Sequence, residues 1–346
     1  MLGLGNSITS ASYKEDGYPA NAFVFTVKTD TAGHATRSND DQFSLPVQAN
    51  SPSNVNNFAR PLIDVDWGDG TQTIDLGKDS DVTEDTGERT FTRSTHTYDT
   101  AGTYTITITP ATNFAGSGHD TDGSPPMRNW DFGGTKDDTK MLEVLNWGLL
   151  PSGGYFSFYG CSNMTVSATD NAKFAFDGNG VDYSGKVSLS GQFMFRGCTA
   201  LTTIGPNWNF EKLANARKML DGSTNWNQDI TYWYLGKNSS DGSVHTNFGN
   251  ASNDCQSMFA NTSFNGDGLW NNNFAKVVTF SSFLSGTSLT NANYDLILIN
   301  WGADGAPAQT STQTVTFPAT RSESGESEAG FDRLVAGNWA GINDEN

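Results

Sequence analysis

The chain has 346 residues, of which 36% are hydrophobic, 12% aromatic and only 17% charged, so it can bury a core and is too rich in rings for a disordered chain. Its formal net charge of −18 argues against nucleic acid or an anionic membrane as the main partner, because both bind through cationic patches. Gly, Ser, Thr, Asn and Asp dominate the remainder, which is typical of strands and turns, and three cysteines are too few for a disulfide scaffold.

Residues 1–20 contain no cationic stretch followed by a continuous apolar run, and no run of 18 apolar residues occurs anywhere. We therefore expect no secretory signal peptide and no membrane insertion. The short start is predicted to be an arm that docks onto neighbouring subunits.

Three segments between residues 21 and 110 alternate apolar and polar residues with the period of a β-strand. Asp69-Gly70 and Ala101-Gly102 supply turn signals next to two of them. The faces predicted to be buried are those of Phe23, Phe25 and Val27, of Ile63, Val65 and Trp67, and of Tyr104, Ile106 and Ile108.

The order of residues in this region resembles the PKD domain, an immunoglobulin-like β-sandwich. The resemblance covers about residues 20–110, and the family's usual W-D-F-G-D-G is V-D-W-G-D-G here. In such domains the motif is structural, so the resemblance implies that the Asp-Gly loop and the His/Tyr stretch tie neighbouring strands together. The matching motif residues are Trp67, Asp69, Gly70, His96, Tyr98, Gly102 and Tyr104.

Two chemical alternatives exist for the same stretch. Oxygen-rich loops can hold Ca²⁺, so Asp64, Asp66 or Asp69 could serve as ligands, although no other cofactor is expected. His96 is the histidine nearest these carboxylates in sequence, so a catalytic pair is the second alternative. The chain contains none of the usual hydrolase, phosphate-loop, zinc-protease or dinucleotide motifs, and we predict no catalytic residues.

Residues 111–140 are rich in Gly, Asp and Pro and predict a linker or loop. Beyond them a four-residue motif recurs: an apolar residue, any residue, Gly or Asn, then Cys, Ser or Thr. It occurs at 158–161, 195–198, 220–223, 259–262 and 284–287, with spacings of 37, 25, 39 and 25 residues. Such spacings predict stacked turns of a solenoid, some with loop insertions. The equivalent motif residues are Gly160, Cys161, Gly197, Cys198, Gly222, Asn261 and Gly286.

The longer segments around the motif share further positions, including Met219 with Met258, Asn227 with Asn265 and Trp233 with Trp270. They resemble the BspA-like leucine-rich repeats of bacterial surface proteins over about residues 141–346. The end of the chain is similar to the terminal cap of such arrays. Together the two resemblances imply a mainly β chain: an arm (1–20), a sandwich (21–110), a linker (111–140) and an irregular repeat solenoid (141–346) with short helices at the C-terminus.

Residues 291–301 are predicted to form a helix with Asn291 as its N-cap and Leu296, Ile297 and Ile299 inward, and residues 330–336 a second helix. Cys161 and Cys198 occupy matching repeat positions, so they are either bonded to each other or buried as free thiols. Cys255 lies outside the motif and has no expected partner.

Aromatic residues are the main functional hint. Trp226, Tyr232, Trp233 and Trp270 lie near Asn and Asp residues, and stacked turns could set some of them on one face to hold a sugar. The alternative is that they fill the core. Rings at 232–234 fall on both faces of any strand, so at least one is expected to be exposed.

The sequence favours a non-enzymatic structural protein of a bacteriophage virion: a tail, fibre or capsid-decoration component that acts in assembly or host-surface adhesion. Its expected partners are other virion proteins, copies of itself, and a glycan or protein of the host surface. A bacterial cell-surface adhesin with BspA-like repeats is the alternative. A polysaccharide-binding or polysaccharide-degrading protein is the lesser alternative.

Overall fold

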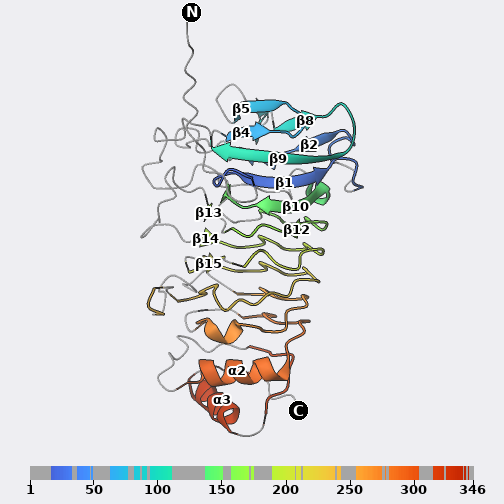
Figure 1. The fold of residues 1–346 in the computed structure, drawn as a ribbon. Helices are drawn as coiled ribbons and strands as arrows, with labels where there is room; N and C mark the ends of the chain where they lie inside the picture. The colour runs from blue at the N-terminus through green and yellow to red at the C-terminus, as the bar shows by residue number, and fades with distance from the viewer. Residues whose placement is uncertain are drawn as a thin grey trace, which may run out of the picture.

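The structure, a computed structural model, describes most of the chain between residues 17 and 342. The chain forms an elongated stack, with a β-sheet at one end and two α-helices at the other (Figure 1). The described residues are 17–32, 37–46, 48–49, 63–76, 82–85, 88–91, 94–110, 137–150, 157–170, 173–174, 189–206, 208–211, 213–237, 240–242, 255–274, 277, 280–303, 315–322, 325–337, 339 and 342. The predicted arm at 1–20 lies almost wholly outside them.

A six-stranded mixed sheet forms the first end of the stack. Its strands follow the order β12-β10-β1-β9-β4-β5, and all neighbours are antiparallel except β10 and β12, which are parallel. The strands are β1 (Phe23–Lys28), β4 (Ile63–Asp66), β5 (Gln72–Leu76), β9 (Thr103–Pro110), β10 (Met141–Asn146) and β12 (Thr165–Val166).

The predicted alternation along β1, β4 and β9 is confirmed. All the side chains expected inward are buried except Tyr104, which is partly buried against the core. On the opposite face of β9, Thr103 and Thr105 are exposed. Val24 is buried as well, so β1 is covered on both faces.

Shorter ladders complete the strand inventory. In the first part of the chain, β2 (Gln42–Ser44) pairs with β8 (Thr95–Thr97), and β7 (Glu88–Phe91) lies between β3 (Gln48–Ala49) and β6 (Val82–Asp85). In the stack, β11 (Leu149–Leu150) pairs with β13 (Lys173–Phe174), and β14 (Leu189–Ser190) with β15 (Leu213–Asn215), both in parallel.

The sheet and the stack share one core. Trp147, directly after β10, stacks on Phe23 of β1 and packs edge-on against Phe195 and Trp208 of the later turns. Its indole Nε1 donates to the carbonyl of Ile204 at 2.9 Å. The predicted boundary between residues 140 and 141 therefore falls inside a continuous sheet and core, since β10 pairs directly with β1.

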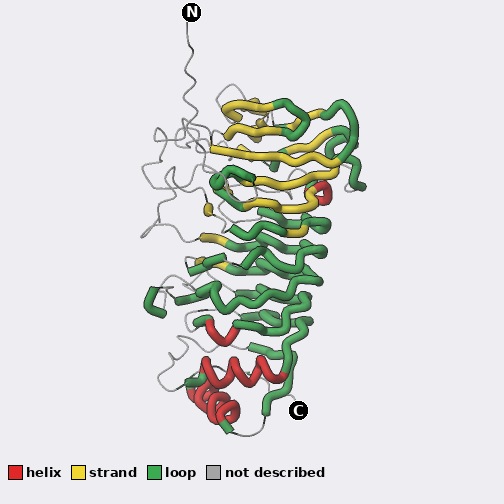
Figure 2. Tube along the Cα trace, in the orientation of Figure 1, coloured by secondary structure: helices red, strands yellow, loops and turns green. Residues whose placement is uncertain are grey.

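Beyond the sheet the chain consists of turns that lie on top of one another. Most of this part contains neither helix nor long strand (Figure 2). We number the eight residues that end in the recurring motif as positions 1 to 8. Four of these octapeptides are fully described, at 191–198, 216–223, 255–262 and 280–287, and the end of a fifth is at 157–161.

A backbone ladder joins successive octapeptides in register. Amides at positions 3, 5 and 7 of one octapeptide donate to carbonyls at positions 2, 4 and 6 of the next; for example, Phe195 donates to Met219 at 2.9 Å and Gly197 to Asp221 at 2.9 Å. The intervening amides donate within their own turn, as Met194 does to Gly191. The segments that carry the motif therefore lie side by side in chain order, as the sequence predicted.

The Gly or Asn of the motif has a conformational reason. At position 7, four glycines have φ between +70° and +81°, and Asn261 has φ +57°. Glycine, and to a lesser degree Asn, adopts this left-handed region without the Cβ clash that other residues suffer. Position 3 is left-handed too, but there the residues are Phe193, Lys218, Ser257 and Ser282.

The Cys, Ser or Thr at position 8 is a small buried donor. Ser223 Oγ donates to the carbonyl of Phe195 at 2.6 Å, Thr262 Oγ1 to that of Phe259 at 2.8 Å, and Cys198 Sγ to that of Phe158 at 3.0 Å. Of the two alternatives for Cys161 and Cys198, the structure has buried thiols that form no disulfide. Cys255 is also a buried thiol outside any disulfide, and it occupies position 1 of its octapeptide.

Two α-helices cap the far end among the described residues, α2 (Asn291–Trp301) and α3 (Glu326–Ala336). The prediction for α2 was right in its bounds and wrong in detail: Thr290 is the N-cap and accepts from the Asn293 amide, and Leu298 rather than Leu296 is buried. The helix predicted at 330–336 begins four residues earlier. The predicted mainly β class is confirmed, and no helix in the described part of the chain is long and apolar enough to cross a membrane.

Candidate functional site

The predicted motif residues of the first region meet in one cluster, which we call the ring cluster: Trp67, Asp69, His96, Tyr98 and Tyr104. The imidazole of His96 stacks on the Trp67 indole with ring centroids 4.7 Å apart and meets the Tyr98 ring edge-on at 4.5 Å. Tyr98 in turn stacks on Tyr104 at 3.7 Å. These rings come from three separate segments, so the cluster joins β4, β8 and β9.

Hydrogen bonds fix the polar edges of the ring cluster. The Tyr98 hydroxyl donates to the carbonyl of Trp67 at 3.2 Å, and the Trp67 indole donates to Thr73 Oγ1 at 2.9 Å. Burial raises the pKa of Tyr98, and the charge of Asp69 adds to that effect. The Tyr104 hydroxyl donates to the Thr100 carbonyl at 2.6 Å. Tyr98 is therefore held as a neutral structural group, and the Tyr104 hydroxyl is fixed by its hydrogen bond to the backbone.

Asp69 lies at the turn between β4 and β5, where Gly68 and Gly70 both have positive φ. One carboxylate oxygen accepts from the amide and hydroxyl of Thr71, and the other is 2.7 Å from His96 Nε2. Partial burial acts to raise the pKa of Asp69, but the hydrogen bonds from Thr71 and His96 outweigh it and lower the pKa to about 2.

This geometry differs from a catalytic relay. In a relay the acid and the nucleophile bind opposite nitrogens of the imidazole. Here Thr71 Oγ1 (3.4 Å) and Asp69 Oδ2 both face Nε2, and Thr71 donates directly to Asp69. The arrangement instead ties the hairpin turn to β8, the architectural role that the resemblance implied.

Of the alternative calcium ligands, Asp64 and Asp66 lie in β4, and Asp69 lies in the turn that follows it. The Asp66 carboxylate accepts from the Gly68 amide and the Gln72 side chain. Asp69 is bonded to Thr71 and His96 as described. Among the described residues no group of three or more His, Cys, Asp and Glu side chains is arranged to hold a metal ion.

Gly102 has a structural role as well. Its amide donates to Thr29 Oγ1 at 3.0 Å, and its carbonyl accepts from the Thr29 amide at 2.9 Å. Thr29 is completely buried. The turn before β9 is thus closed onto the end of β1.

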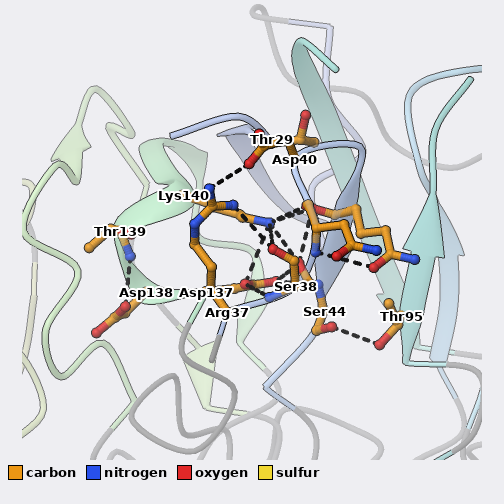
Figure 3. A network of polar contacts seen from close by, with 12 residues as sticks. Thr29, Arg37, Ser38, Asp40, Ser44, Thr95, Asp137, Asp138, Thr139 and Lys140 are labelled. Atoms are coloured by element: carbon orange, nitrogen blue, oxygen red, sulfur yellow. Dashed lines mark hydrogen bonds and ion pairs between the residues drawn. The ribbon is translucent and has the colours of Figure 1, made fainter. Parts of the chain in front are cut away.

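A second polar cluster was not predicted. It contains Asp137 and Lys140, whose side chains are fully buried, and we call it the buried ion-pair network (Figure 3). Asp137 directly precedes η3 (Asp138–Lys140) and Lys140 ends it, immediately before β10 and within the segment 111–140 that was expected to be a linker. The expectation was wrong for residues 137–140, which are packed against the loop before β2.

Every polar atom at the centre of this network has a partner. Lys140 Nζ donates to the carbonyls of Asn39 (2.9 Å) and Gln42 (2.8 Å) and to Ser38 Oγ (2.6 Å), and it lies 3.6 Å from Asp137 Oδ1. The Asp137 carboxylate accepts from the Ser38 amide and hydroxyl and from the Ser44 amide. Burial lowers the pKa of Lys140, while the charge of Asp137 acts in the opposite direction. The network pins residues 38–44 to the start of β10.

The only sequence signal for this network was weak. Two opposite charges stand three residues apart directly before an apolar alternating run, and nothing in a single sequence distinguishes them from the surrounding Gly- and Asp-rich stretch.

On the outer side of the turns, side chains also connect neighbours. Asp221 accepts from Arg196 Nε at 3.1 Å and from Asn261 Nδ2 at 3.1 Å, which links three successive octapeptides. The Arg196 guanidinium lies over the rings of Tyr159 and Phe193, at 5.4 and 5.6 Å from their centroids. Arg196 and Asp221 at position 6 and Asn261 at position 7 thus connect the three octapeptides through their side chains.

The four aromatics considered as ligand contacts are not on one exposed face. Trp226 and Trp233 are completely or almost completely buried, with ring centroids 5.6 Å apart, so the core alternative holds for both. Trp270 is partly buried against the core. Tyr232 is exposed, which confirms that the rings at 232–234 fall on both sides of the chain.

No protein-family model and no curated protein matches the sequence, and no solved structure matches the fold. The resemblances to PKD domains and BspA-like repeats therefore stay predictions.

Proposed function

We propose that the chain is a non-enzymatic structural protein of a bacteriophage virion, a tail, fibre or capsid-decoration component that acts in assembly, host-surface adhesion or both. In this proposal residues 21–110 form a PKD-like sandwich, and residues 141–346 form an irregular solenoid of BspA-like repeats with a helical cap. Its partners are other virion proteins, copies of itself, and a host-surface glycan or protein.

The observation that carries the proposal is how the polar groups of the described residues are used. Asp69 and His96, the chemical candidates of the sequence, and the buried Asp137 and Lys140 each bond to backbone or to side chains of neighbouring segments. The octapeptides are joined by a backbone ladder and a continuous core. An elongated, acidic, cysteine-poor body with such internal bonding suits a scaffold of a particle.

Location in a particle is the decisive test. Antibodies against the purified chain, applied to purified phage particles and viewed by immunogold electron microscopy, should label one position regularly, and peptide mass spectrometry should find the chain in the same particles. An antibody absorbed with the purified chain is the control. Particles that lack both label and peptides would contradict the proposal.

The alternative is a bacterial cell-surface adhesin with BspA-like repeats. Tyr232 is exposed while most large rings of the described residues are buried, which supports a role in adhesion as much as in assembly. Cell fractionation separates the two: an adhesin is found in the cell envelope of bacteria that make no particles.

The lesser alternative is a polysaccharide-binding or polysaccharide-degrading protein. A turnover assay on mixed polysaccharides tests degradation, with Asp69→Asn as the variant and Asp99→Asn as the control. A hydrolytic rate that disappears only in Asp69→Asn would favour an enzyme, because a catalytic carboxylate cannot be replaced by an amide.

A further inference from the structure

Tyr232 is the aromatic residue that the described part of the chain leaves most open to solvent. It is 65% exposed, while Trp233 beside it is 1% exposed. The other large apolar side chains that are exposed in the described ranges are the aliphatic Ile74, Leu296 and Val335. Burying a ring of this size is favourable, so an open Tyr next to a buried Trp is a candidate contact for a ligand.

The backbone under Tyr232 is fixed on both sides. Before it, the Thr231 amide donates to Asp229 Oδ1 at 2.8 Å, and the Thr231 carbonyl accepts from Asn271 Nδ2 at 2.6 Å. After it, the Leu235 amide donates to Asn272 Oδ1 at 2.8 Å. The next turn of the stack therefore holds this segment rigidly, so little conformational entropy is lost when the ring binds a ligand.

Tyr234 completes a pair of rings. Its backbone has φ +53°, in the left-handed region that residues other than glycine rarely adopt. Its ring lies 6.5 Å from that of Tyr232, centroid to centroid, at an angle of 50°. The two tyrosine rings are therefore neighbours on either side of the buried Trp233 in the sequence, and we call this pair the tyrosine platform.

Polar groups border the platform. Thr231 Oγ1 donates to Asp229, and Lys237 Nζ donates to Asn271 Oδ1 at 3.0 Å. Tyrosine rings offer flat faces to the C–H groups of a sugar, and the bordering hydroxyl and amide groups can exchange hydrogen bonds with its hydroxyls. The net charge of −18 opposes the approach of an anionic polymer.

We infer that the tyrosine platform, Tyr232 with Tyr234, binds a neutral polysaccharide. The inference rests on the adhesive part of the proposed function and gives that role a ligand class and a site. Tyr232 supplies the main stacking face, Tyr234 the second ring, and the fixed backbone between them keeps the two rings at a constant separation.

Native affinity electrophoresis tests the inference with the intact chain. Gels contain a soluble neutral glucan, a neutral galactomannan, the carboxylated polymer polygalacturonate, or no polymer. The wild-type chain should be retarded by at least one neutral polymer and not by polygalacturonate. Tyr232→Ala should raise the apparent Kd about tenfold or more, as loss of a central aromatic contact does, whereas Tyr232→Phe should stay within about threefold.

Val335→Ala is the matched control, because Val335 is an exposed apolar side chain on α3 at the far end of the stack. It should leave retardation unchanged. Equal circular dichroism spectra and melting temperatures for all variants show that binding rather than folding has changed.

Three results would overturn the inference: no retardation by either neutral polymer, equal retardation of Tyr232→Ala and wild type, or preference for polygalacturonate. A dimer in sedimentation experiments that Tyr232→Ala dissociates would assign the platform to self-association instead. Failure here is distinguishable from failure of the proposed function, because labelling of particles does not depend on sugar binding.

Discussion

The sheet and the turn stack are stabilised in different ways. In the sheet region, individual residues far apart in sequence make unique contacts, such as His96 with Asp69 and Lys140 with residues 38–42. In the stack, the backbone amides of the same positions make the same hydrogen bonds in successive octapeptides. The stability lost by a substitution in the sheet region should therefore depend on the individual residue. The stability lost by a substitution in the stack should depend on the position of the residue in its octapeptide.

The largest expected effect is at the buried ion pair. Asp137→Ala leaves Lys140 without its counter-charge and leaves the Ser38 and Ser44 amides without an acceptor, and we expect the free energy of unfolding to fall by about 3–5 kcal/mol. Urea unfolding followed by tryptophan fluorescence measures it. Asp137→Asn keeps an acceptor oxygen, so it should lower the free energy of unfolding by less than Asp137→Ala does.

A solvent-exposed pair provides the control for Asp137. Lys28 Nζ lies 3.8 Å from Asp30, and both side chains are about half exposed. Asp30→Ala should change the free energy of unfolding by no more than about 1 kcal/mol. If Asp137→Ala and Asp30→Ala cost the same, the network does not stabilise the junction as described.

The same contrast explains what the sequence could predict. Position 7 is visible because the left-handed backbone there selects Gly or Asn, and position 8 because a small buried donor selects Cys, Ser or Thr. Position 3 is left-handed as well, yet it is occupied by residues such as Phe193 and Lys218, which are not typical of that conformation. The sequence therefore revealed only the second half of the octapeptide.

Side-chain placement was harder to predict than backbone pattern. Trp226, Tyr232 and Trp233 have similar surroundings in the sequence, and only the packing of the neighbouring turn decides that Tyr232 alone is exposed. Asp137 and Lys140 are recognised only when residues 38–44 are brought to them, because their partners lie about a hundred residues earlier. Long-range polar contacts leave no local pattern to read.

Two glycine substitutions, one in the stack and one in the sheet region, are expected to have the next largest effects on stability. Gly222 has φ +78°, and an added Cβ would lie 3.9 Å from Gly197, so Gly222→Ala should cost only the backbone penalty of about 1–2 kcal/mol. Gly68 in the sheet has φ +81°, and its Cβ would lie 2.3 Å from the Thr105 carbonyl oxygen, so Gly68→Ala should cost more. Thermal unfolding compares the two.

Gly222→Asn provides the positional control, because Asn261 occupies the equivalent place with φ +57°. It should destabilise the chain less than Gly222→Ala. A larger loss for Asn than for Ala would show that the octapeptide positions are not interchangeable.

Acid should weaken the ring cluster. The pKa of folded Asp69 is about 2, below its ordinary value of 3.8, so the folded state gains stability above about pH 4 and loses it as the pH falls toward about 2. Asp69→Asn should remove this part of the pH dependence, by no more than about 1 kcal/mol, because the side chain is partly exposed to solvent. Urea unfolding at about pH 5 and about pH 2.5 measures it.

Asp99→Asn, at an exposed position two residues before Ala101-Gly102, controls for the loss of any surface carboxylate. If Asp69→Asn and wild type show the same acid dependence, the bonds from Thr71 and His96 do not hold the carboxylate in its charged form.

The smallest expected effect is that of Cys198→Ser, at position 8 of the stack. Ser223 fills in one turn the place that Cys198 fills in the turn before, and each donates to the carbonyl at position 5 of the preceding octapeptide. Cys198→Ser should therefore change the free energy of unfolding by less than about 1 kcal/mol. Cys198→Val removes the donor while the Phe158 carbonyl keeps its bond from the Cys161 amide, so we expect a loss of about 0.5–1.5 kcal/mol. Thermal unfolding ranks the two variants.

Thiol labelling checks the same position without a substitution. Burial raises the pKa of the Cys198 thiol, and Cys161 and Cys255 are buried as well, so an excess of a thiol reagent should label none of them in the native chain and all three in denaturant. Fewer than three labels in denaturant without reductant would reveal a bond between Cys161 and Cys198. A rapid reaction of Cys198 in the native chain would mean that the turns open readily. The backbone ladder would then not be strong enough to explain why the stack tolerates a substitution such as Cys198→Ser.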